Sequence, residues 1–199
     1  MRLRSFVMAG GTLLMVATLC LGQAAQKKMP PRPHAKSAAM APMSMGPPPE
    51  MAKVSWLSGN WTCSGKTYAS PTMGPAHPTE ATVSAGPELG GHWVVSRYRE
   101  KKTPQNAMPT EADEYWTYDA AAKTWQRLVM DTTGGWAVGT SPGWDRGKIV
   151  WTSEGAMGGQ KMKLRDTFTQ KSAREIAYVG EIGSSDGKFS TIWNVTCKK

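Results

Sequence analysis

The chain has 199 residues and a formal net charge of +9, from 24 Lys and Arg against 15 Asp and Glu. Residues 53–199 hold 18 of the basic side chains and 14 of the acidic ones, a net +4, so the first 52 residues carry the larger share of the excess. No run of Lys and Arg interleaved with aromatic residues occurs, which excludes the usual footprint of a nucleic-acid-binding protein.

Residues 1–24 have the pattern of a secretory signal peptide. Arg2 and Arg4 precede an apolar stretch over 6–21, and small residues follow at the predicted cleavage site. The apolar stretch is shorter than the roughly 20 residues that a membrane span needs, so we expect no span. Cys20 raises the alternative of a lipoprotein, although the residue before it is not the small one that a lipobox requires. The sequence therefore predicts a periplasmic or secreted protein.

Residues 25–52 have the composition of a flexible spacer. They include seven prolines and no aromatic residue. Such a segment cannot bury enough apolar surface to offset the entropy of ordering. Its four Lys and Arg against one Glu suggest contact with an anionic envelope surface, with plain solvation as the alternative.

The same spacer contains a group of methionines, Met40, Met43 and Met45. Thioether sulfur is a soft ligand that suits Cu(I), so one hypothesis is a copper-handling protein that binds the metal through these residues. The alternative is that methionine is a tolerated linker residue, because no cysteine or pair of histidines completes the ligand set.

Residues 53–199 have the size of one domain with one sizeable core. Segments of strand composition follow one another with turn residues between them, and only residues 50–57 show a short helical pattern. This series predicts an all-β fold, a closed antiparallel meander barrel of about eight to ten strands with a short N-terminal helix. The expected strands are 60–68, 79–84, 92–102, 112–119, 124–131, 135–141, 147–153, 161–169, 173–182 and 188–198.

The domain contains two cysteines, Cys63 in the first expected strand and Cys197 in the last. Because the chain is expected to be exported and the count is even, we expect a disulfide, with two buried free thiols as the alternative. A disulfide needs Cα atoms roughly 4.4–6.8 Å apart, which is the spacing of facing residues on neighbouring antiparallel strands. The bridge would place the first and last strands side by side and close the sheet.

Several short motifs then carry a family resemblance. Gly59-Asn60-Trp61 resembles the glycine–any–tryptophan signature of calycins, the lipocalins, fatty-acid-binding proteins and their relatives. Together with residues 56–61, 88–95 and Tyr118-Asp119, it is similar to an uncharacterised bacterial exported family with a calycin-like barrel. The resemblance implies the fold, and fold does not fix function. It also implies that a basic residue of the last strand, here Lys198, packs over Trp61.

No catalytic set is recognisable in the domain. His77 and His92 are its imidazole bases, and there is no Gly-x-Ser-x-Gly elbow, zinc-ligand spacing or phosphate-binding glycine loop. We therefore expect a protein that is not an enzyme and has no cofactor. A haem-dependent enzyme similar to nitrobindin is an alternative, with Tyr178 as a conceivable axial ligand because no histidine follows His92.

Aromatic residues recur nearly once per strand, and arginines lie among them. The first hypothesis is a cavity with aromatic walls that binds a small amphipathic or hydrophobic molecule, with an anionic head on a guanidinium. A barrel filled by its own side chains, acting as a structural or interaction module, is the alternative, with Glu114 or Asp166 as the partner of an inward arginine. The candidate ligand-binding residues are Trp93, Arg97, Arg99, Trp116, Tyr118, Trp125, Arg127 and Tyr178.

Overall fold

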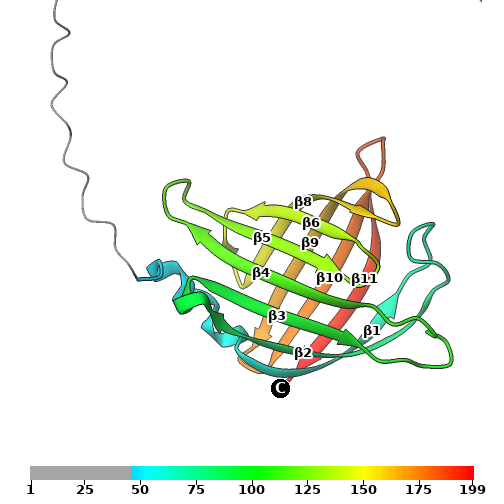
Figure 1. Cartoon of the computed structure of the whole chain (residues 1–199), viewed down its shortest axis with the longest axis horizontal. Helices are drawn as coiled ribbons and strands as arrows, with labels where there is room; N and C mark the ends of the chain where they lie inside the picture. Colours follow the sequence, from blue (N-terminus) through cyan, green and yellow to red (C-terminus); the bar gives the residue numbers. More distant parts are fainter. Residues whose placement is uncertain (1–45) are drawn as a thin grey trace, which may run out of the picture. The chain divides into compact units, whose positions relative to one another are not determined.

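The structure, a computed structural model, describes residues 46–199, which form one curved sheet preceded by a short 3₁₀ helix (Figure 1). No helix in this part of the chain is long and apolar enough to cross a membrane. The elements in chain order are η1 (Pro49–Leu57), β1 (Gly59–Thr67), β2 (His77–Glu88), η2 (Leu89–Gly91), β3 (Trp93–Glu100), β4 (Glu111–Asp119), β5 (Thr124–Asp131), β6 (Trp136–Ser141), β7 (Trp144–Asp145), β8 (Lys148–Met157), β9 (Gln160–Ser172), β10 (Glu175–Gly183) and β11 (Phe189–Lys198).

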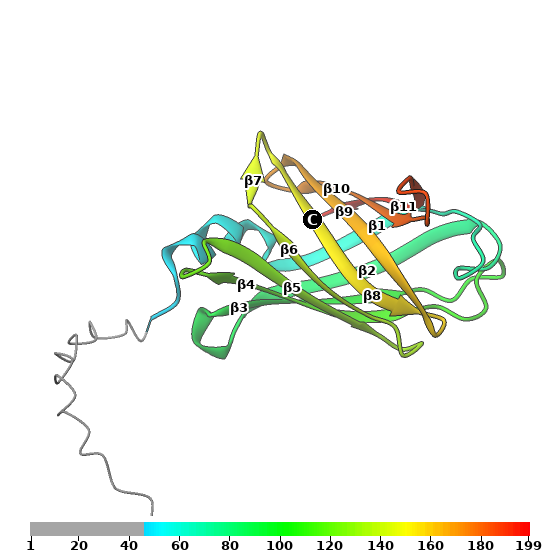
Figure 2. The same cartoon turned by 90° about the horizontal axis from the view of Figure 1, so that it is seen from above.

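Ten of the eleven strands close into a barrel (Figure 2). Successive strands from β1 to β6 and from β8 to β11 pair antiparallel, each with the next along the chain. The circuit closes where β1 pairs with β11 and where β6 pairs with β8, while the two-residue β7 pairs with β8 outside it. The closed antiparallel meander predicted from the sequence is therefore confirmed.

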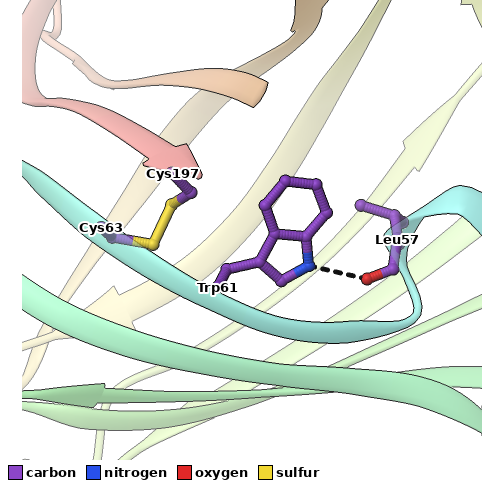
Figure 3. Close-up of a disulfide and its surroundings, with 4 residues drawn as sticks. All are labelled: Leu57, Trp61, Cys63 and Cys197. Carbon is purple, nitrogen blue, oxygen red and sulfur yellow. Dashed lines mark hydrogen bonds between the residues drawn. A yellow bond between two sulfur atoms is a disulfide. The ribbon is translucent and has the colours of Figure 1, made fainter. Parts of the chain in front are cut away.

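The disulfide lies across the junction of the first and last strands (Figure 3). Cys63 faces Cys197 in the β1–β11 register, and their Cα atoms are 4.0 Å apart. Trp61 and Cys63 of β1 are both almost fully buried, so this face of the strand points inward. The predicted bridge is confirmed, and it joins residues 134 positions apart in the sequence.

The barrel has two distinct ends, because the connections of an antiparallel meander alternate between them (Figure 1). η1, η2 and the β4–β5 turn lie at one end, here called the helix end. The β1–β2 connection (68–76) and the β3–β4 connection (101–110) lie at the other, here called the loop end.

The helix end is filled by side chains. Met51 and Val54 of η1 are buried in a cluster with Trp116, Trp125 and other core residues of the barrel. This helix matches the predicted helical segment, and because it begins at Pro49 the expected boundary between spacer and domain falls inside it. The barrel is therefore plugged at this end.

The lysine that packs over Trp61 is one position further along the chain than expected. Lys198 lies 3.5 Å from Glu175, whereas Nζ of Lys199 lies 4.4 Å from the centre of the Trp61 ring. Lys199 also donates to the backbone oxygens of Trp56 and Ser58 at 2.7 and 2.8 Å. Trp61 in turn donates to the carbonyl of Leu57 at 2.8 Å (Figure 3). The basic residue over the signature tryptophan is thus Lys199, and the expectation for Lys198 is wrong.

A bulge changes which residues of β11 face inward. The register pairs Gly180 with Trp193 and then Glu181 with Thr191, so Ile192 is the extra residue. Ile192 is 1% exposed and belongs to the core, whereas Phe189 lies under the guanidinium of Arg165, 4.2 Å from its ring centre. Phe189 and Thr191 therefore do not share the face of Trp193, as plain alternation along the strand would require, because alternation does not continue across a bulge.

Removal of the disulfide tests the closure of the sheet. Cys63→Ala with Cys197→Ala should lower the free energy of unfolding by about 5 kcal/mol on the chain-entropy model, because the bridge closes a very long loop. Urea unfolding of the double variant, beside the parent protein with and without reductant, gives the value. An unchanged midpoint, or two thiols that can be alkylated in the native parent protein, would contradict the bridge.

Candidate functional site: the cavity inside the barrel

A cavity of about 510 Å³ lies inside the barrel, beyond the plug of η1. Its walls are inward side chains from most strands, and residues of both long loop-end connections line it. Met108, one of these lining residues, is 88% exposed, so the cavity reaches the surface at the loop end. A volume of this size is within the range of small-molecule sites, roughly 300–1,000 Å³.

Four aromatic side chains form a continuous row along the cavity wall, contributed by β4, β9, β10 and β11. Ring centres are 5.1 Å apart for Trp116 and Phe168, 4.7 Å for Phe168 and Tyr178, and 6.4 Å for Tyr178 and Trp193. Gly180 makes room for this row, because a Cβ there would lie 2.5 Å from the Trp193 ring. The result is one broad aromatic wall. We call it the ring row.

A charged cluster lies beside the ring row, at Arg127. Its Nε donates to Glu114, and its NH1 donates to Asp166 at 2.6 Å. Tyr178 donates to the other oxygen of Asp166 at 2.7 Å, and the indole N–H of Trp116 donates to Glu114. The side chains of Arg127 and Asp166 are 5% and 4% exposed, so the cluster lies deep in the barrel.

Burial alone would lower the pKa of Arg127, but the charges of Glu114 and Asp166 outweigh it and raise that pKa. Arg127 is the inward arginine that the sequence led us to expect. Its partners are the two internal acids, which was the stated alternative to a ligand anion. The cluster holds one positive and two negative formal charges, so it offers no unneutralised guanidinium to an anionic head.

Arg97 and Arg99 lie on the outer wall, which corrects the expectation that they line the cavity. In β3 the residues on the other face, including Ser96 and Tyr98, line it. Arg97 donates to Glu88 at 2.6 Å, and this hydrogen bond lowers the pKa of Glu88. Arg99 pairs with acidic side chains of β4. The physical reason is that both faces of β3 carry large side chains, so alternation alone does not show which face is inward.

The remaining predicted aromatic residues are divided between three places. Trp93 shares the outer face of Arg97 and contacts Tyr115 edge-on at 6.4 Å. Trp125 and Tyr118, 5.4 Å apart, pack in the plug at the helix end and not among the cavity residues. Of the eight predicted ligand-binding residues, Trp116, Arg127 and Tyr178 line the cavity.

The loop end has a polar pair that sequence reasoning missed as a site. Nε2 of His77 lies 3.6 Å from Glu100, and Glu100 also accepts from the backbone N–H of Thr110 at 3.0 Å. Both side chains line the cavity and are mostly buried. His92 lies between η2 and β3, outside the cavity lining, and its carbonyl accepts from Thr117. No signal in the sequence identifies His77, because the expected strand begins at residue 79 and β2 begins two residues earlier.

Of the two alternatives that involve a metal, the structure bears on haem binding through Tyr178. Burial, followed by the charge of Asp166, raises the pKa of Tyr178 well above its ordinary value, which disfavours the phenolate that an iron ligand requires. Within residues 46–199, no group of three or more His, Cys, Asp or Glu side chains is arranged to hold a metal ion. Met40, Met43 and Met45 lie outside the described residues.

The comparisons with known proteins bear on the fold. No protein-family model and no curated protein matches the chain. Among solved structures, the chain is similar to Rv2717c from M. tuberculosis, with a TM-score of 0.58 and 13% identity over 77% of this chain and 98% of that one. A redesigned β-barrel matches with a TM-score of 0.39 and 12% identity over 73% of this chain and 93% of that one, too distant to carry an argument. At such identities the likeness shows a β-barrel fold and nothing finer, so membership of a calycin family stays a prediction.

Replacement of Arg127 tests the charged cluster. Arg127→Met leaves Glu114 and Asp166 as like charges in the interior, and we expect the free energy of unfolding at pH 7 to fall by about 3–5 kcal/mol. The deficit should shrink towards pH 5, because the variant can relieve the repulsion by taking up a proton on folding. Urea unfolding at both pH values measures this.

Arg165→Met is the matched control on the outer wall. Arg165 pairs with Glu181 at 2.7 Å and its side chain is 42% exposed, so its loss should cost less than about 1 kcal/mol. Equal losses in the two variants would contradict a buried cluster at Arg127.

Proposed function

We propose that this chain is a non-catalytic binding protein for a small, largely apolar molecule held inside the barrel. The observation that carries the proposal is the cavity of about 510 Å³ with the ring row on its wall. A barrel that served only as a scaffold would gain stability by filling this volume, since a cavity costs packing energy.

The polar groups of the cavity favour binding over catalysis. Arg127 and Tyr178 donate to the two oxygens of Asp166, so these groups hold one another in an interior network. His77 shares the loop end with Glu100, and neither has a nucleophilic serine or thiol as a hydrogen-bond partner within residues 46–199. The polar groups therefore orient a guest, and the aromatic wall supplies contact area.

An exported location agrees with this function. The leader pattern of residues 1–24 predicts export, and the Cys63–Cys197 bridge is the kind of disulfide that persists in an oxidising compartment. A periplasmic or secreted barrel would meet its guest outside the cytoplasm. The basic spacer at 25–52 would then bring the barrel to an anionic envelope surface.

A substitution that fills the cavity tests the proposal. Val129 lines the cavity from β5, and Val129→Trp should weaken binding of decan-1-ol by at least about tenfold by occupying its volume. Val138→Trp is the matched control, because Val138 lies on the neighbouring β6 and is 50% exposed on the outer wall. Isothermal titration calorimetry gives both affinities.

We expect the parent protein and Val138→Trp to bind one molecule of decan-1-ol with similar affinity. Near-ultraviolet circular dichroism and thermal unfolding confirm that each variant is folded. No saturable binding to the folded parent protein, or equal binding by both variants, would overturn the proposal.

A further inference from the structure

We propose that the guest carries a cationic group, of the alkylammonium type, which binds at Glu114 against the ring row. The inference rests on the proposed function and adds the chemical class of the ligand. Three observations carry it: the balance of charge in the cavity, the hydrogen bonds of the two carboxylates at Arg127, and the aromatic surface beside them.

The cavity lining contains more acid than base. Four carboxylates and two basic side chains line it, and two of the carboxylates are engaged near the loop end. Glu100 faces His77 and the N–H of Thr110, while Asp131 accepts the backbone N–H groups of its own turn. The other two carboxylates share the single guanidinium of Arg127. An excess of one negative charge therefore remains in that cluster.

Both acids in the cluster accept hydrogen bonds from neighbouring side chains. Asp166 accepts on one oxygen from Arg127 and on the other from Tyr178. Glu114 accepts from Arg127 and from the indole N–H of Trp116.

Glu114 has an oxygen available to a guest. Both of its hydrogen bonds fall on Oε1, and no donor within residues 46–199 bonds to Oε2. The side chain of Glu114 lines the cavity and is 16% exposed, four times the value for Asp166. A donor that carries positive charge would complete the coordination of this oxygen and neutralise the excess charge.

The ring row is the second half of an ammonium site. Trp116, a member of the row, donates its indole N–H to Glu114, and aromatic rings attract cations. Arg127 already uses this attraction, since its guanidinium carbon lies 5.5 Å from the centre of the Phe168 ring. A carboxylate beside aromatic faces binds an alkylammonium group, and the same surroundings repel an anion of equal length.

Three probes of equal chain length test the inference on the parent protein. Decylammonium, decan-1-ol and decanoate share an apolar body and differ in head charge at pH 7. We expect decylammonium to bind at least about tenfold more tightly than decan-1-ol, and decanoate to bind more weakly than decan-1-ol. Calorimetric titration in one buffer at fixed salt gives the three affinities.

A pair of glutamate variants locates the charge. Glu114→Gln removes the excess charge, so the preference for decylammonium over decan-1-ol should fall to within about threefold. Glu154→Gln is the matched control, because Glu154 is exposed on the outer face of β8, and it should keep the preference of the parent protein.

The outcomes separate the two proposals. If none of the probes binds, the proposed function fails. If decan-1-ol binds and the ammonium is no tighter, or decanoate binds best, the binding function stands and the cationic guest is wrong. Should Glu114→Gln not fold, the order of the three probes on the parent protein still decides the question.

Discussion

Closure of the sheet at the β1–β11 junction is the constraint on which the rest of this structure depends. Without that pairing, β1 and β11 would be exposed edges, and the residues on the concave face would meet water instead of one another. The Cys63–Cys197 bridge fixes the junction covalently. Lys199 and Trp61 fix it again near the helix end, where the lysine lies over the indole ring and bonds to the backbone of residues 56 and 58.

Closure creates an interior that the chain fills unevenly. The plug of η1, with Met51 and Val54, packs the helix end, so apolar burial is concentrated there. Towards the loop end the same walls enclose the cavity, with the Arg127 cluster between the two regions. A buried arginine between two acids adds little net stability, because desolvation cancels much of the Coulomb attraction. On the proposed function, its place in the wall of the cavity serves recognition of the guest.

Much of the fold could be predicted from the sequence, since it is encoded locally. Alternation with a period of two identifies the strands, glycine-containing turns separate them, and two cysteines in the first and last strands indicate the closure. The site could be predicted only in part. Alternation showed that Arg97 shares a face with Trp93, but large side chains on both faces of β3 concealed which face is inward. The sequence suggested Glu114 or Asp166 as the partner of an inward arginine. That Arg127 is this arginine and bonds both acids, Asp166 being 39 positions away, is shown only by the closed fold. The bulge at Ile192 likewise cannot be recognised from the sequence, in which apolar and polar residues still appear to alternate.

The central claim is that a small molecule occupies the interior of the barrel. Crystals of the protein grown with 10-bromodecan-1-ol test it directly, because bromine can be located by its anomalous scattering. We predict bromine density inside the barrel, with the chain of the probe along the ring row between Trp116 and Trp193. Bromine only on the outer wall, or an interior closed by the barrel's own side chains, would contradict the claim.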